Sequence, residues 1–481
     1  DDADLDAMIA ATLGNDPVLV LLDGCEHIIG DLPAVIAEFL RRSPQVRILV
    51  TSREALFMTG EQRLLLEPLP VGVDSPATRL FLDRASIPNI ELDGETSRSA
   101  ARIAADVSGL PLGIELAAAR HRTMSLHEIA DQLDNQPQLL ATKRGPERRH
   151  LSIVAALDWS YRLLDDHQQH TFRQLAVFLT GMIPVDGAAV VLGTDSPSPL
   201  LRDLVDLSLL VAPDDEDRFR ILEPIRQYAA MRLDEAGERV PTERRYAQWL
   251  VELAREMRHL ALMGYAHRAF PLLRAQAPAI AAATSWAIQH DEPDTALELV
   301  AAAGRLWPRV ADPRTLREPA REILERLETP LNDVAVAALA TTAFLYRLDQ
   351  PHVAERLGKR LEAQLQHITD PATLAIVNDA LAVIPIGRDT VTPEQAAACL
   401  SQWRTSVDLL AQLGYPAEPQ YRNGAILLDL LGQFDDAQDM LDRMLDFADE
   451  SRPVVRGLAL EMLSDYSLLL RGDHRACLLY T

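Results

Sequence analysis

The chain has few cysteines, no long apolar run and no basic leader, and each absence excludes a class of protein. Its three cysteines, Cys25, Cys399 and Cys477, are too few and too far apart for a disulfide framework or a paired metal-ligand motif. No apolar run approaches the roughly 18 residues that span a bilayer, and no basic segment followed by an apolar one opens the chain. We therefore expect a protein of the reducing cytoplasm that does not contact a membrane.

Basic residues are also scarce. The 47 lysines and arginines face 71 aspartates and glutamates, so the formal net charge is −24. This charge provides no general attraction to a nucleic acid, and we expect any DNA contact to lie in a domain outside this sequence. The length of 481 residues suffices for about three or four domains. The chain begins without a methionine and ends just after a new helix would open, so we expect truncation at both ends.

The first 53 residues have the pattern of a parallel α/β unit. The run 17–23 is apolar and ends in Asp23, which indicates a buried strand, and 46–53 has the same character. An amphipathic helix is predicted between them over 31–42. A strand, a helix and a second strand at this spacing predict a right-handed parallel crossover.

The next segment is predicted to be helical and to end in a small domain with a hairpin. Apolar periodicity predicts helices over 78–85, 95–107, 112–120, 198–210 and 223–235, and two more within 151–179. Residues 209–212 and 218–222 flank the turn-forming run 213–217, which indicates a β-hairpin. Helices that end in a hairpin predict a winged helix, and Gly237 is a plausible cap for its last helix.

From residue 241 onward the pattern predicts helical hairpins. They are punctuated by Pro271, Pro293, Pro308, Pro330, Pro351, Pro371, Pro393 and Pro416. The clearest repeat unit is 432–437, in which a glycine, an aromatic residue and an alanine occur at the spacing of tetratricopeptide (TPR) hairpins. Weaker copies occur at 294–296, 352–354 and 472–476, and their irregular spacing predicts a degenerate solenoid.

Two side chains at strand ends are candidates for a nucleotide site. Asp23 ends the first strand, and the carboxyl edge of a parallel sheet is where ligands bind and where a carboxylate can hold Mg²⁺. Arg53 ends the second strand, where a guanidinium can contact a terminal phosphate with two hydrogen bonds. An aspartate that merely caps a strand is the alternative for Asp23.

Short motifs follow one another along the first half of the chain. They are LLDGCEH (21–27), ILVTSRE (48–54), GE (60–61), GLPL (109–112), AALDWSY (155–161) and LEPIRQYA (222–229). In this order they resemble the motifs of the STAND (NB-ARC-type) signal-transduction ATPases. More closely, they resemble the actinobacterial AfsR-type and large ATPase-containing LuxR-type transcriptional regulators.

The resemblance implies a mixed fold and a set of site residues. Its parts would be a truncated P-loop NTPase α/β core (1–72), a helical lid (73–145), a winged helix (150–240) and an all-α TPR-like solenoid (241–481). Asp23 would be the Walker B carboxylate that holds Mg²⁺, and Glu26 would substitute for the water-activating carboxylate because Gly24 stands where many relatives have Asn or Asp. Arg53 would be the sensor arginine at the γ-phosphate, and Pro111 would contact the adenine.

One family motif is missing. The phosphate-binding loop G-x-x-x-x-G-K-[ST] occurs nowhere in the sequence, so we expect ATP or ADP with Mg²⁺ to need a loop upstream of Asp1. The full-length protein would be a slow ATPase, and this fragment by itself inactive. We therefore expect an ATP/ADP-dependent regulatory switch whose repeats sense a protein or a small molecule, and which can self-oligomerise. The alternative is a non-catalytic TPR-like interaction scaffold that carries an inactive NTPase remnant.

Other residue clusters have simpler interpretations. Cys25 and His27 lack the second pair of ligands that a zinc site needs, and no nucleophile elbow surrounds Ser52 or Ser108. The basic run 143–150 is typical of a solvated interdomain linker. The aromatic residues Trp159, Tyr161, Phe172 and Phe178 are expected in the core.

Overall fold

The computed structural model describes most of the chain. It divides into two compact units, and the boundary along the chain falls between Leu69 and Pro70. The described residues are 17–25, 28–43, 45–52, 55–64, 66–87, 94–134, 154, 156–212, 218–327, 330–347, 349–385 and 391–469. Within these ranges, no helix combines the length and the apolar character needed to cross a membrane.

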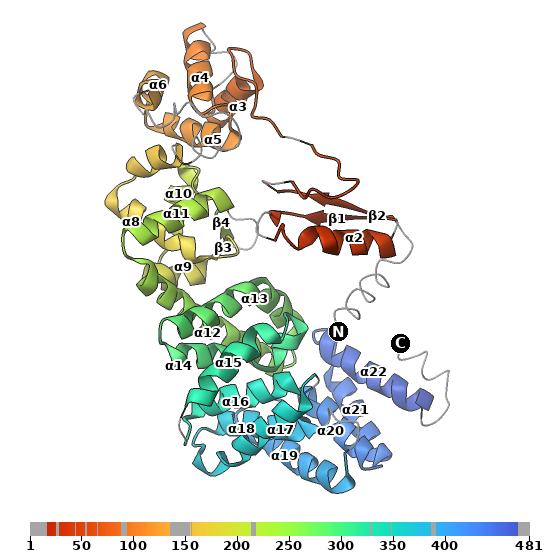
Figure 1. Cartoon of the computed structure of the whole chain (residues 1–481). Coiled ribbons are helices and arrows are strands. Elements are labelled where there is room, and N and C mark those ends of the chain that lie inside the picture. The colour runs from red at the N-terminus through yellow and green to blue at the C-terminus, as the bar shows by residue number, and fades with distance from the viewer. Residues whose placement is uncertain are drawn as a thin grey trace. The chain divides into compact units, whose positions relative to one another are not determined.

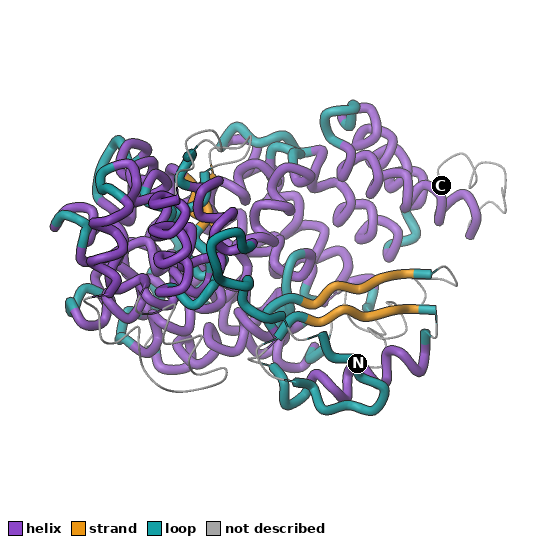
Figure 2. Tube along the Cα trace, turned by 90° about the horizontal axis from the view of Figure 1, so that it is seen from above, coloured by secondary structure: helices purple, strands orange, loops and turns teal. Residues whose placement is uncertain are grey.

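The first unit is the predicted parallel α/β piece. Strands β1 (Val18–Leu22) and β2 (Val46–Val50) pair in parallel, and their register runs from Val18 opposite Val46 to Leu22 opposite Val50. Figure 2 shows the two strands side by side, and helix α2 (Leu32–Arg42) lies along them (Figure 1). Leu32 and Ile36 of α2 are buried in a small core with Cys25, and Leu22, Ile48 and Val50 pack against it.

The expectation of fully buried strands is wrong for this unit. Leu19 and Leu21 of β1 are 60% and 66% exposed, and Leu49 of β2 is 55% exposed. Successive side chains of a strand point to opposite faces of the sheet, and α2 packs against only one of those faces. No described element of this unit covers the other face.

The second unit begins with four helices, of which three were predicted. They are α3 (Pro76–Arg84), α4 (Gly94–Asp106), α5 (Pro111–Ala119) and α6 (Leu126–Asp134), with the 3-10 turn η3 (Arg120–Arg122) before α6. Helix α6 was not predicted, although Ser125 and Glu128 carry the signature of a capping box. Glu128 accepts hydrogen bonds from the Ser125 N–H and hydroxyl, each at 2.8 Å.

The winged-helix region follows and contains the predicted helices with a small antiparallel sheet. Residues 156–162 are helical, and the later elements are α8 (Asp166–Gln174), η4 (Leu175–Val177), β3 (Met182–Pro184), α9 (Val185–Leu192), α10 (Ser198–Asp206), β4 (Arg218–Arg220) and α11 (Glu223–Glu235). The break expected near residues 164–166 coincides with a capping box in which Asp165 accepts from the Gln168 N–H at 2.8 Å. Gly237 has φ +68 after α11, as its capping role requires.

The predicted hairpin is only part of this sheet. Val211 bridges Arg220 antiparallel, but the main partner of β4 is β3, which was not predicted. A strand of three residues is too short to show an alternating pattern, so its pairing is decided by the packing of the helices around it. The predicted helix 198–210 ends at Asp206, and the turn 213–217 lies outside the described residues.

The remainder of the unit is a helical solenoid (Figure 1). Its helices are α12 (Arg239–Leu262), α13 (Ala266–Gln289), α14 (Pro293–Ala303), α15 (Arg314–Arg326), α16 (Asp333–Tyr346), α17 (Pro351–Glu362), α18 (Pro371–Val383), α19 (Pro393–Gln412), α20 (Tyr421–Leu430), α21 (Phe434–Phe447) and α22 (Pro453–Leu469). The 3-10 turns η5 (Gly304–Arg309), η6 (Leu365–His367) and η8 (Glu418–Gln420) join some of them.

Most of the expected proline boundaries hold, with one clear exception. Pro293, Pro351, Pro371 and Pro393 each begin a helix, where proline fits because its missing N–H needs no partner. Pro271 lies inside α13, so the hairpin break predicted there is wrong. Helix α13 contains Pro278 as well. It buries a long apolar face that includes Leu273 and Ile280, and this packing outweighs the loss of two backbone hydrogen bonds.

The repeat motif has the expected geometry. Gly432 has φ +71 at the turn between α20 and α21, and Ala437 in the first turns of α21 is fully buried. Ala296 and Ala354, at the two weaker copies, are also fully buried. A small side chain at these positions allows two helices to approach closely. The third weak copy, 472–476, lies outside the described residues.

Candidate functional site

Asp23 lies at the carboxyl end of β1 and is tied to the end of β2. The Thr51 hydroxyl donates a hydrogen bond to Asp23 Oδ1, and the Gly24 N–H donates to the Thr51 hydroxyl at 3.0 Å. Two backbone bonds continue the ladder, from the Thr51 N–H to the Leu22 carbonyl at 2.9 Å and from the Cys25 N–H to the Thr51 carbonyl at 3.0 Å. Asp23 therefore presents an exposed, oriented carboxylate at the sheet edge where the sequence predicts a Mg²⁺ ligand.

The turn after Asp23 explains its flanking residues. Gly24 has φ +65, a backbone conformation that glycine adopts without strain. Cys25 is buried beneath the sheet edge and packs in the small core with α2. Within the described ranges no group of three or more His, Cys, Asp or Glu side chains could hold a metal ion. Glu26, His27 and Arg53 lie outside those ranges, so their predicted roles stay predictions.

The Gly-Leu-Pro-Leu motif forms a tight connection between α4 and α5 of the second unit. Ser108 and Gly109 both have positive φ, +58 and +67, and Pro111 is the exposed first residue of α5. A Cβ added to Gly113 would lie 2.9 Å from the Cβ of Val107, so a glycine there permits the close approach of the two helices. The structure thus gives these residues a structural role, and the adenine contact of Pro111 stays a prediction.

Three consecutive residues of the AALDWSY motif each contact a different element. Asp158 accepts a hydrogen bond from the Tyr228 hydroxyl of α11 at 3.0 Å. The Trp159 indole N–H donates to Gln132 Oε1 of α6 at 3.0 Å. The Ser160 carbonyl accepts from Arg120 Nη2 at 2.7 Å. This short helix therefore joins the lid to the winged helix.

Asp158 also links the two winged-helix motifs through charge. Its side chain is 9% exposed and forms ion pairs with Arg232 and, at 2.6 Å, with Arg162. The Arg232 Nε donates to the Tyr228 hydroxyl oxygen at 2.8 Å. Burial raises the pKa of the Tyr228 hydroxyl, which keeps the proton that it donates to Asp158.

The aromatic residues assigned to the core lie there. Trp159 is 3% exposed, and Phe172 and Phe178 are fully buried. Tyr161 packs against the same core, with its ring centroid 5.9 Å from the rings of Phe172 and Tyr228. These contacts support a packing role for this cluster.

Arg120 is a functional candidate that sequence analysis missed. It is only 4% exposed, its Cζ lies 6.0 Å from the centroid of the Trp159 ring, and burial lowers its pKa to about 10. A buried guanidinium at the junction of two subdomains is a costly feature unless hydrogen bonds compensate it. Nothing in the local sequence around Arg120 distinguishes it from a surface arginine.

Comparisons with known proteins agree with this description. No family model matches the chain. A protein of Mycobacterium bovis and one of Mycobacterium tuberculosis, both provisionally named HTH-type transcriptional regulators, are 34% identical to it over 310 residues. That match covers 61% of this chain and 34% of each relative, so the chain spans about a third of their length. An uncharacterised protein of M. tuberculosis is 33% identical over 253 residues, 50% of this chain and 64% of its own.

A solved structure has the same architecture. It is a signal-transduction ATPase with numerous domains (STAND) from Pyrococcus horikoshii that carries a tetratricopeptide repeat sensor. The two share 12% identity and a TM-score of 0.51, over 99% of this chain and 72% of that one. At this identity the likeness concerns the fold. In its fold, the chain is therefore similar to this STAND protein, as the sequence predicts.

Proposed function

We propose that this chain is the central part of a nucleotide-dependent switch in a bacterial regulator. ADP would hold the α/β piece, the lid and the winged helix closed, and a signal read by the helical repeats would favour an open ATP state. The observation that carries the proposal is the Asp23 carboxylate, held at the sheet edge by Thr51. The STAND fold and the names of the mycobacterial relatives support a regulatory role.

The residues at the sheet edge fit a magnesium ion. Mg²⁺ in nucleotide sites keeps several waters and takes only one or two carboxylates, the rest of its shell coming from phosphates. Asp23 offers Oδ2 for this purpose, since Thr51 is bonded to Oδ1 and Oδ2 has no hydrogen-bond partner among the described residues. When bound, the ion would neutralise the charge of the terminal phosphates. Arg53 and Pro111 are proposed as γ-phosphate and adenine contacts, and Glu26 as the group that orients water.

The contacts between lid and winged helix are suited to an element with discrete states. Moving an equilibrium from 1:99 to 99:1 takes about 5.5 kcal/mol of differential binding. The buried Arg120 and Asp158 contacts resist partial opening, because each leaves a partly buried polar group unpaired when its partner moves. Slow ATP hydrolysis would then reset the switch. We propose a cytoplasmic location and DNA binding only through a domain outside this sequence.

The first test is to sequence the DNA on both sides of the coding segment and translate it in frame. A G-x-x-x-x-G-K-[ST] loop at a short α/β distance before Asp1, with a DNA-binding domain at either end, is the expected result. The longer protein is then titrated with a fluorescent ADP analogue in the presence of Mg²⁺. Asp23→Asn should weaken the Mg²⁺-dependent part of binding by about tenfold or more.

Asp31→Asn is the matched control for this titration. Asp31 is an exposed aspartate of the same unit, and its side chain makes no capping hydrogen bond to α2. An equal effect of the two substitutions would contradict the role assigned to Asp23. A complete upstream reading frame without a phosphate loop would refute the switch altogether and favour the alternative, a TPR-like interaction scaffold.

A further inference from the structure

The curved solenoid encloses a cavity with an unusual charge. The cavity has a volume of about 310 Å³ and is lined by residues from helices along the solenoid, from α12 to α22. Its closure is visible in contacts between distant residues: the Tyr265 hydroxyl accepts from Arg452 at 3.1 Å, and the Tyr415 hydroxyl lies 3.2 Å from His259 Nδ1. This volume is at the lower end of the range for small-molecule sites, about 300–1,000 Å³.

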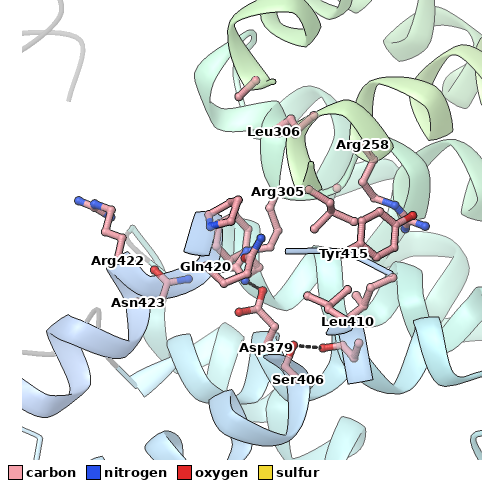
Figure 3. A pocket seen from close by; sticks show the side chains of 18 of the residues that line it. Arg258, Arg305, Leu306, Asp379, Ser406, Leu410, Tyr415, Gln420, Arg422 and Asn423 are labelled. Atoms are coloured by element: carbon pink, nitrogen blue, oxygen red, sulfur yellow. Dashed lines mark hydrogen bonds and ion pairs between the residues drawn. The ribbon is translucent and has the colours of Figure 1, made fainter. Parts of the chain in front are cut away.

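Five arginines and one carboxylate line the cavity. The arginines are Arg258, Arg305, Arg309, Arg347 and Arg422, and the carboxylate is Asp379. In a chain of net charge −24, such a local excess of positive charge is notable. Figure 3 shows Arg305 and Asp379 together in the middle, with Arg258 and Tyr415 to one side and Arg422 and Asn423 to the other.

Only one of these arginines forms a direct ion pair with a described carboxylate, although the charge of Asp370 also acts on Arg258. Arg305 forms an ion pair with Asp379, whereas the structure shows no ion pair between Arg258, Arg347 or Arg422 and any described carboxylate. Burial and the neighbouring charge of Arg422 lower the pKa of Arg347 to about 10, and burial lowers the pKa of Arg258. The Nε of Arg422 is buried without a hydrogen-bond partner among the described residues.

The guanidinium groups are held by aromatic packing. Arg305 and Arg347 both lie over the ring of Phe344, with Cζ at 4.5 Å and 3.8 Å from its centroid. Two like charges at one ring repel each other, and removing them from water costs free energy unless an anion is nearby. Apolar side chains, including Leu410 and Val455, make up much of the remaining wall. The site therefore combines unbalanced cations with an apolar surface.

We propose that this cavity binds a small amphiphilic anion, a molecule with one carboxylate or phosphate group and an apolar body. The anionic group lies among Arg258, Arg305 and Arg347, and the apolar body lies against Phe344 and Leu410. The proposal names a ligand for the sensor of the proposed function. It rests on that function only because the function makes the repeats a sensor. Binding itself requires no nucleotide.

The test is isothermal titration calorimetry of the 481-residue chain with decanoate, octyl phosphate and n-octanol. Decanoate or octyl phosphate should bind at one site, and octanol, which lacks the charge, at least about tenfold more weakly. The tighter of the two anions identifies the head group. Equal affinity for octanol, or binding of an oligoglutamate peptide in place of all three, would overturn the proposal.

Arg258→Gln should weaken anion binding about tenfold and leave octanol binding unchanged. Arg255→Gln is the matched control, since Arg255 lies on the same helix but pairs with Glu252 at 2.5 Å and does not line this cavity. Arg347→Gln is a second variant, and it should also weaken anion binding without changing octanol binding. The comparison of decanoate with octanol on the unmodified chain tests the proposal even if a variant fails to fold. Equal effects of Arg258→Gln and Arg255→Gln would refute the site.

Failure of this inference can be told apart from failure of the proposed switch. Anion binding to a longer protein that does not bind ADP would contradict the switch and keep the site. Nucleotide binding through Asp23 without anion binding would contradict the site and keep the switch.

Discussion

The contact between Asp158 and α11 gives the sharpest test of how the winged helix is held together. Asp158→Ala removes the acceptor of the Tyr228 hydroxyl and the ion-pair partner of Arg232 and Arg162. Breaking a buried ion pair costs about 3–5 kcal/mol. Arg232 keeps Glu235 at 2.6 Å, and Arg162 is 61% exposed, so we expect the lower end, about 3 kcal/mol.

Hydrogen exchange measured by mass spectrometry locates this loss. If α11 opens as a unit, about 3 kcal/mol corresponds to roughly 150-fold faster exchange of the Glu223–Glu235 amides. Tyr228→Phe, which removes only a hydroxyl, should cost about 1 kcal/mol, and its effect should not add to that of Asp158→Ala. Asp203→Ala changes an exposed aspartate of α10 and serves as the control. An increase below tenfold for Asp158→Ala, or one equal to that of Asp203→Ala, would refute the reasoning.

Three further predictions concern stability, measured as the midpoint of thermal unfolding. Gly424→Ala places a Cβ 2.6 Å from the Trp403 ring and should destabilise the protein by about 1–2 kcal/mol. Gly457→Ala, in open space on α22, should instead stabilise it by about 0.5–1 kcal/mol. A change of the same sign for both substitutions would contradict the packing around Gly424. Arg317→Lys should cost about 2 kcal/mol, because its buried guanidinium donates two 2.6 Å bonds to one carboxylate, and an unchanged midpoint would refute that. Burial raises the pKa of Asp106 from 3.8 to about 6, because the folded state disfavours the charged carboxylate. The folded state therefore carries no penalty from this group below pH 3.8, where the carboxyl is neutral, and loses stability as the pH rises through about 6. Asp106→Asn should therefore stabilise by about 1 kcal/mol at pH 7.5, allowing for its half-buried position, with little gain near pH 4; a gain independent of pH would disprove this.

Local patterns were sufficient for many elements. The apolar runs within 17–23 and 46–53 predicted β1 and β2, because a parallel strand needs only a short apolar segment between turns. Gly237 and Gly432 marked helix ends, because a positive φ restricts the choice of residue. The capping box of α6 could also have been found from Ser125 and Glu128.

Other features depended on what packs against a segment. The exposure of Leu19 and Leu21 follows from the coverage of one sheet face, which the composition of the strand does not reveal. The passage of α13 through Pro271 follows from the core on which it packs. For the candidate site, Asp23 was predicted from its motif and lies at the expected edge, while its bond to Thr51 required the pairing of the two strands.

By itself, the sequence determined the order of the α/β, helical and repeat segments and the position of Asp23 at the end of β1, since these depend on periodicity and on backbone conformation over a few neighbours. Only the tertiary structure decided which side chains share a site. Asp158 meets Tyr228 across 70 residues, and Arg258, Arg305 and Arg347 come from separate elements of the solenoid. Each of these arginines resembles a surface arginine in its local sequence. Their burial and their shared, unbalanced charge arise when the helices curve around one cavity.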